Sequence, residues 1–181
     1  FNMSYSVGQL HQYSVELYKT LEAETGQAVG FHENGNLRLA TTRERMDEYR
    51  LYSCTAETIG VACELIGVDE IKKLWPLIDA DGLVGALWHS TDGHIAPVDV
   101  TMAMAKGART MGATIHQQTQ VTAIERSDES EWIVKTDNGD IRCEHVICAT
   151  GNYARTTARM VGLEIPVIPV EHQFIVTDVD P

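Results

Sequence analysis

The segment His145-Val-Ile-Cys-Ala149, followed by Thr150 and Gly151, constrains the fold more than any other feature of the sequence. A short apolar run without alternation is typical of a strand that is buried on both faces of a sheet. Gly151 ends the run, and a helix is predicted to start near Asn152. A strand that leads through a glycine into a helix is typical of open α/β sheets, in which ligands bind at the carboxyl ends of strands. The residues alone favour a plain tight turn over a ligand-binding one.

Composition excludes several classes of function. The chain has 181 residues, of which 44% are hydrophobic and 22% charged, so it is globular and fits one ordinary domain or most of two small ones. A net charge of −12 repels phosphate backbones and anionic lipid surfaces, which argues against nucleic-acid or membrane partners. No apolar run is long enough to span a membrane, and no signal peptide is visible. Since the chain opens with Phe1 rather than Met, we expect that processing or truncation removed a preceding segment.

Cysteines and histidines do not form a metal-binding pattern. The four cysteines lack CxxC spacing and the seven histidines include no HxxxH pair, so we predict buried, reduced thiols in a cytosolic-type compartment and no metal site. The sequence also has no GxGxxG and no GxxxxGK[ST] motif. The chain therefore lacks a phosphate-binding loop of its own and is not a complete Rossmann enzyme.

Periodicity predicts alternating helices and short strands. Helices are expected over 6–26 (with a capping box at Ser6 to Gln9), 41–60, 69–74, 97–112 and from about 152. A hairpin is expected over 28–41 with its turn at Asn34-Gly35, and a second strand pair over 83–88 and 93–95. Further strands are expected at 113–115, 119–126, 132–136, 141–143 and 167–177, with a turn at Asn138-Gly139.

Five segments in the same order and spacing resemble the dimethylglycine and sarcosine dehydrogenase family, which belongs to the D-amino-acid-oxidase-like flavoproteins. They are Gly35-Asn-Leu-Arg-Leu-Ala40, Asp92-Gly-His-Ile-Ala-Pro97, Val121-Thr-Ala-Ile124, Ala149-Thr-Gly151 and Val170-Glu-His-Gln-Phe174. Together they cover nearly the whole chain. Tyr153 and Ala96 stand where many relatives have Trp and Asp, and both departures look tolerable.

The resemblance implies a mixed α/β (α+β) fold in which a partial FAD-binding domain is interleaved with a mixed-sheet substrate domain. Residues 1–96 then hold an N-terminal helix and a piece of the substrate domain. Residues 97–164 are a piece of the FAD domain, and 165–181 are a return strand of the substrate domain. The family's GxGxxG loop and flavin-linking histidine would precede Phe1, so we expect an interior fragment that is inactive alone.

The same resemblance assigns site residues. It implies that the backbone of Val121 meets the adenine end of FAD, and that Cys148, Ala149, Thr150 and Gly151 contact the cofactor near the pyrophosphate and ribityl. It also implies that His172 faces the substrate amine beside the flavin ring. Alternation over Val170 to Thr177 alone favours a core histidine, and for Val121 the residues alone favour a plain strand position.

The implied activity is the FAD-dependent oxidation (demethylation) of N-methylated amino acids such as dimethylglycine or sarcosine, in the cytoplasm or, in a eukaryote, the mitochondrial matrix. The one-carbon unit would be released or passed to folate through domains outside this chain. The family also contains a non-catalytic relative, the regulatory subunit of pyruvate dehydrogenase phosphatase. This relative suggests an alternative in which the fold mediates protein interaction rather than catalytic turnover. A stand-alone binding module is the third interpretation.

Overall fold

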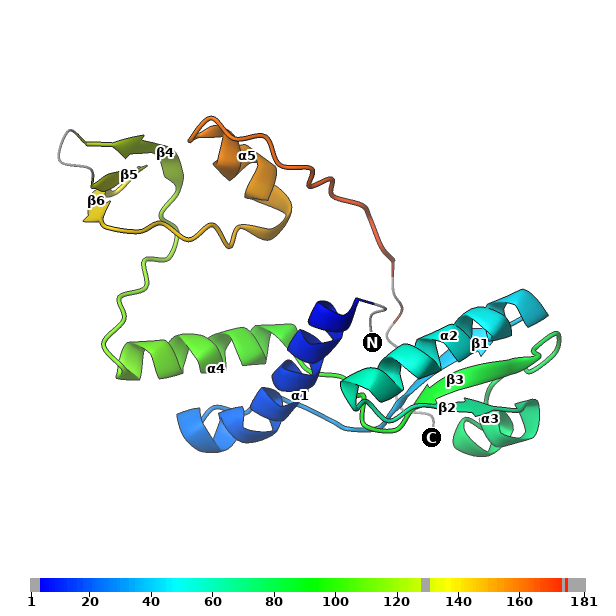
Figure 1. The fold of residues 1–181 in the computed structure, drawn as a ribbon. Helices are drawn as coiled ribbons and strands as arrows, with labels where there is room; N and C mark the ends of the chain where they lie inside the picture. The colour runs from blue at the N-terminus through cyan, green and yellow to red at the C-terminus, as the bar shows by residue number, and fades with distance from the viewer. Residues whose placement is uncertain (1–3, 128–130, 174, 176–181) are drawn as a thin grey trace. The chain divides into compact units, whose positions relative to one another are not determined.

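The computed structural model describes residues 4–127, 131–173 and 175. They belong to two compact units, Phe1–Ile115 and His116–Pro181, each with its own three-stranded sheet (Figure 1). The predicted mixed α/β class is confirmed. Within the described residues, none of the helices has the length and hydropathy that crossing a membrane requires. The division into 1–96, 97–164 and 165–181 concerns the domains of a whole enzyme and stays a prediction.

Helices α1 (Tyr5–Thr25) and α4 (Pro97–Thr110) pack against each other through small and aliphatic side chains. Leu21, Val29 and Ala103 are buried together at this contact. Pro97 occupies the first turn of α4, where its missing N–H costs nothing. Helix α1 begins after Ser4, so the predicted capping box at Ser6 is wrong, while its end at Gly26 is confirmed by a left-handed φ of 63°.

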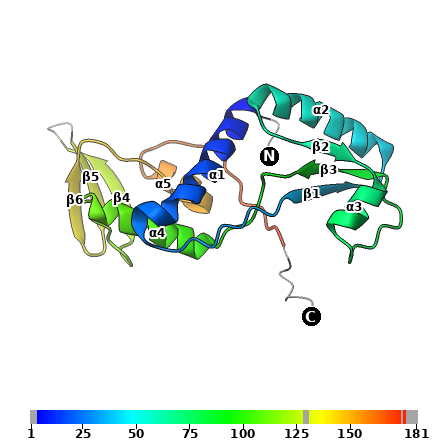
Figure 2. The same cartoon turned by 90° about the horizontal axis from the view of Figure 1, so that it is seen from below.

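The sheet of the first unit has the strand order β1-β3-β2, with both pairings antiparallel. Its strands are β1 (Asn36–Ala40), β2 (Glu64–Ile66) and β3 (Gly85–His89). Helix α2 (Arg43–Ile59) covers one face, where Tyr49 packs on Ala40 and Leu87. Helix α3 (Val68–Leu74) covers the other, where Ile71 packs on Ile66 and Ala86. Figure 2 shows the two helices on opposite sides of the sheet.

The predicted hairpin over Ala28–Thr41 is wrong, and so is the pairing of 83–88 with 93–95. Instead, β1 pairs with β3, and an isolated antiparallel bridge joins His32 to His94. Gly35 does have the positive φ of a turn residue, at 80°. However, the ring of Trp88 lies where a Cβ of residue 35 would be, so this glycine permits a close contact between distant segments. Non-local pairing has overridden the local Asn-Gly signal.

The second unit contains an antiparallel meander followed by a short helix. Its strands are β4 (Val121–Arg126), β5 (Trp132–Thr136) and β6 (Gly139–Cys143), and the predicted turn at Asn138-Gly139 is confirmed. A 3-10 turn over Gly151–Tyr153 leads into α5 (Ala154–Arg159), close to the predicted helix start. The predicted strand at 113–115 is absent from the described secondary structure. The predicted burial of the cysteines is wrong as well, since Cys54 and Cys148 are exposed and Cys63 and Cys143 are only half-buried.

Two further strand predictions fail in this unit. Residues 145–149 form no strand, and Ile147 is 89% exposed, because no described strand lies beside them to supply hydrogen bonds. Residues 167–173 and 175 also form no strand, with Val170 85% exposed. The remainder of the strand predicted over 167–177 lies outside the described residues.

Candidate functional site

The turn Cys148–Gly151 is exposed and lies at the start of a helical segment. All four of its residues are exposed, and Tyr153 N–H donates to the Thr150 carbonyl at 3.0 Å as the 3-10 turn begins. Gly151 has a φ of 53°, which disfavours any other residue. A Cβ at this position would have no protein atom within 4 Å. The glycine is therefore required by the backbone conformation, and it leaves open space beside the chain.

A chain of side-chain hydrogen bonds links this turn to α5. The Cys148 thiol lies 3.3 Å from the Thr150 hydroxyl, which in turn lies 3.0 Å from the Thr157 hydroxyl. Thr157 also donates to the Tyr153 carbonyl at 3.2 Å. The pKa of Cys148 is lowered, first by the Thr150 hydroxyl and then by the Thr150 backbone N–H. These contacts join the turn to α5, while the residues of the turn stay exposed.

An apolar cavity of about 410 Å³ lies within the second unit, next to this turn. Strands β4 and β5 contribute Ile124 and Trp132, and α5 contributes Thr157 and Ala158. Cys148 stands at its wall, together with His145 and Val146 and with residues between 161 and 165. Sequence reasoning missed this cavity because it depends on how the meander packs against α5.

Val121 and His172, the other predicted site residues, occupy less constrained positions. Val121 is the first residue of β4, opposite Thr136, and a bulge follows it before Ala123. Among the described residues, no hydrogen bond joins Val121 to the Cys148–Gly151 turn. His172 is exposed in an extended segment. The structure thus brings Cys148 to Gly151 together as one turn, and the roles of Val121 and His172 stay predictions.

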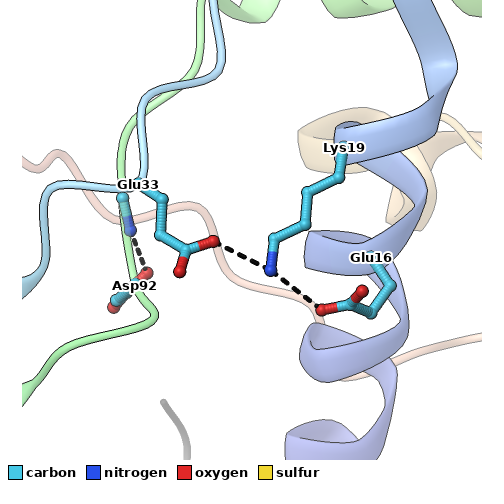
Figure 3. A network of polar contacts seen from close by, with 5 residues as sticks. Glu16, Lys19, Glu33 and Asp92 are labelled. Atoms are coloured by element: carbon cyan, nitrogen blue, oxygen red, sulfur yellow. Dashed lines mark hydrogen bonds and ion pairs between the residues drawn. The ribbon is translucent and has the colours of Figure 1, made fainter. Parts of the chain in front are cut away.

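A second cavity, of about 380 Å³, lies in the first unit. Its walls come from α1, from the residues after α2 and from the end of β3, and they include His11, Lys19, His89 and Asp92. Beside it, Lys19 Nζ lies 2.8 Å from a Glu33 carboxylate oxygen and 3.1 Å from Glu16 Oε1 (Figure 3). These pairs raise the pKa of Lys19 and tie α1 to the segment before β1.

His89 is the one charged or polar residue of the described core, at 1% exposure. Burial is the main reason that its pKa lies below the ordinary value, because a charged imidazole loses solvation there. The strand predicted over 83–88 stops one residue before His89, so the sequence gave no indication that this histidine is buried. The described residues contain no group of three or more His, Cys, Asp or Glu side chains that are close enough together to hold a metal ion.

The sequence matches a known protein family and several characterised proteins. Residues 3–181 match the family model described as DAO, FAD dependent oxidoreductase. Rat mitochondrial dimethylglycine dehydrogenase is 38% identical over 181 residues, which are 100% of this chain and 21% of the rat protein. The mouse mitochondrial pyruvate dehydrogenase phosphatase regulatory subunit is 29% identical over 171 residues, covering 93% of this chain and 20% of its own length.

Solved structures show the same fold. The crystal structure of L-proline dehydrogenase from P. horikoshii superposes with a TM-score of 0.78 at 30% identity. The match covers 86% of this chain and 41% of that one. The chain therefore spans about a fifth of the curated relatives and less than half of this structural neighbour.

Proposed function

This chain belongs to the family of FAD-dependent oxidoreductases, and from that premise we propose that the protein containing it oxidises N-methylated amino acids such as dimethylglycine or sarcosine. The observation that carries the proposal is the 38% identity to dimethylglycine dehydrogenase along the entire chain. The structural likeness to an amino-acid dehydrogenase supports oxidation at a carbon next to nitrogen. FAD, when bound, supplies the acceptor for the hydride that leaves this carbon.

The turn Cys148–Gly151 fits one part of the cofactor. Its four residues are exposed and Gly151 leaves open space, so a dinucleotide has room to approach the main chain closely. The adjoining 3-10 turn offers N–H groups of the kind that bind phosphate oxygens. We propose that Cys148, Ala149, Thr150 and Gly151 contact FAD near its pyrophosphate and ribityl, and that the Val121 backbone meets the adenine end.

His172 is proposed to act on the substrate amine. An ammonium nitrogen holds no free lone pair, so it must lose a proton before the adjacent carbon is oxidised. An imidazole titrates near neutral pH and accepts such a proton. In this proposal His172 holds the amine in its neutral form beside the flavin, after strands from the rest of the protein have covered the segment around it.

Flavin reduction in the complete protein tests the activity. Anaerobic mixing with dimethylglycine or sarcosine should bleach the flavin absorbance, while glycine betaine, which has no proton to lose from nitrogen, should leave it unchanged. Intact flavin that no N-methylated amino acid reduces would contradict the proposal. That outcome would favour the second candidate, an interaction role like that suggested by the name of the regulatory subunit, which is 29% identical.

A glycine pair tests the proposed cofactor contact. Gly151 and Gly162 both have positive φ, at 53° and 76°, and a Cβ at either would meet no protein atom within 4 Å. Gly151→Ala and Gly162→Ala therefore carry a similar backbone cost, roughly 1–2 kcal/mol each. In the complete protein, only Gly151→Ala should lower the FAD content measured by absorbance. Equal FAD content in the two purified variants would show that the turn does not approach the cofactor.

His172→Ala tests the catalytic assignment. In the complete protein it should slow substrate-dependent flavin reduction by about 10²–10⁴-fold while FAD content is unchanged. The defect should shrink at high pH, where the free amine predominates. His116→Ala, another exposed histidine of the same unit, serves as control. If His172→Ala unfolds the protein or removes flavin with normal turnover per bound FAD, its role is structural.

The remaining parts of the proposal concern location and acceptor. The rat relative is named as mitochondrial, and we propose the mitochondrial matrix for a eukaryotic source and the cytoplasm otherwise. Transfer of the one-carbon unit to folate is proposed for domains outside this chain. Release of stoichiometric formaldehyde in the presence of tetrahydrofolate would contradict that transfer.

A further inference from the structure

Two exposed histidines from distant segments lie side by side in the first unit. His32 precedes β1 and His94 follows β3, and their backbones exchange two hydrogen bonds, N–H of His32 to the His94 carbonyl at 2.9 Å and the reverse at 3.0 Å. Such a pair fixes the two Cα atoms at a spacing that brings the side chains together on one face. The two ring centroids are 5.0 Å apart, with a tilt of 32° between the ring planes.

The segment around the pair is held firmly. On one side Gly35 N–H donates to the Asp92 carbonyl at 2.8 Å, and on the other Ala96 N–H donates to the Val29 carbonyl at 3.4 Å. A Cβ at Gly93 would overlap the His32 carbonyl, so the two chains approach closely at this point. The imidazoles therefore project from a backbone that its own hydrogen bonds hold in place.

An amide oxygen orients one of the two rings. His94 Nδ1 lies 3.4 Å from Asn34 Oδ1. An amide oxygen only accepts, so His94 donates through Nδ1 and keeps a lone pair on Nε2. Metal-binding histidines are held in this way, with the second ring nitrogen donating to an oxygen.

The ring spacing also suits a shared ion. Each nitrogen lies about 1.1 Å from its ring centre and would bind the ion at about 2.1 Å. Two ring centres on one ion are then about 4.5 Å apart in octahedral or square-planar geometry and about 5.2 Å apart in tetrahedral geometry. The observed 5.0 Å lies in this range. Both side chains are exposed, so the His32 ring has room to turn about χ2 toward the ion while Asn34 keeps its contact with His94 Nδ1.

We propose that His32 and His94 form a chelating site for one divalent transition-metal ion of the class that imidazole prefers, namely Cu²⁺, Ni²⁺ or Zn²⁺. Asn34 orients His94, and water completes the coordination. Two imidazoles select these ions over Mg²⁺ and Ca²⁺, which take oxygen ligands. A bound ion would fasten the segment before β1 to the segment after β3, independently of any flavin chemistry.

Copper titration of the chain without a polyhistidine tag tests the site. Calorimetry should show one Cu²⁺ per chain, and electron paramagnetic resonance should show two imidazole nitrogens on it. His32→Gln and His94→Gln should each weaken binding by about tenfold or more, and Asn34→Ala by a smaller factor. The matched controls His116→Gln and His145→Gln, which replace exposed histidines of the other unit, should bind as the unchanged chain does.

A second measurement guards against variants that do not fold. In the unchanged chain, Zn²⁺ should raise the thermal unfolding midpoint of the first unit and Mg²⁺ should not, since only a ligand of the native state stabilises it. Copper affinity that is equal in the His32→Gln, His94→Gln and control variants would overturn the proposal. So would a signal from one nitrogen, or a Zn²⁺ response no larger than that of Mg²⁺.

Discussion

Substituting Gly35 by alanine should destabilise the first unit through two separable effects. The first is the backbone cost of a left-handed conformation, since φ is 80° and an L-residue loses roughly 1–2 kcal/mol there. The second is steric, because the new Cβ would overlap the Trp88 ring, and displacing a packed side chain costs about 1–3 kcal/mol. We therefore expect a loss of about 2–5 kcal/mol in the free energy of unfolding.

Gly60 supplies the matched control. It ends α2 with a nearly identical φ of 84°, and a Cβ there would have nothing within 4 Å. Gly60→Ala should therefore show the backbone cost alone, about 1–2 kcal/mol. Urea unfolding of both variants, followed by far-UV circular dichroism, measures the difference. Adding Trp88→Leu should reduce the Gly35→Ala effect to the size of the control. Equal losses for Gly35→Ala and Gly60→Ala would refute the reasoning.

Three further predictions follow from burial, packing and sequence. Burial lowers the pKa of His89, so the unfolded chain binds a proton at this residue more readily than the folded chain does. The free energy of unfolding should therefore be highest above the ordinary imidazole pKa and should decrease as the pH falls through it. In urea unfolding between pH 7.5 and 5, His89→Leu should reduce this pH-dependent decrease in the free energy of unfolding. Ala103 is fully buried between α1 and α4, so Ala103→Leu should lower the free energy of unfolding by about 1–3 kcal/mol in the same assay. Ala105 lies on the same helix but is only half-buried, so Ala105→Leu should lower it less. The chain alone, which has no GxGxxG motif, should quench FAD fluorescence weakly or not at all, and tight stoichiometric quenching would contradict this.

Features set by neighbouring residues were predictable from the sequence. Pro97 starts α4 as expected, and Thr42 caps α2 by accepting from Arg45 N–H at 3.2 Å, one residue from the predicted start. The turn at Asn138-Gly139 also lies where its sequence indicates. In each case the determining contact spans only a few residues, so local propensity decides the outcome.

Features that depend on distant segments were not predictable. Asn34-Gly35 has the local signature of a hairpin, but β1 gains more by pairing with β3 and packing Gly35 beneath Trp88. The apolar run at 145–149 has the composition of a buried strand and forms none without neighbouring strands. In the candidate site, the turn at Gly151 was visible in the sequence. The apolar cavity beside it and the His32–His94 pair were not, because both arise from tertiary alignment.

The order of pairing in the two sheets has a consequence during synthesis. In the meander, Thr136 lies opposite Gly139, so β5 and β6 meet as soon as both have left the ribosome. Strand β1 has no such neighbour, since Ala40 lies opposite Gly85 and α2, β2 and α3 are made in between. At the usual rate of translation β1 waits roughly 2–10 s for its partner. Throughout that interval Leu37 and Leu39 lie on an unpaired strand edge, to which a chaperone can bind.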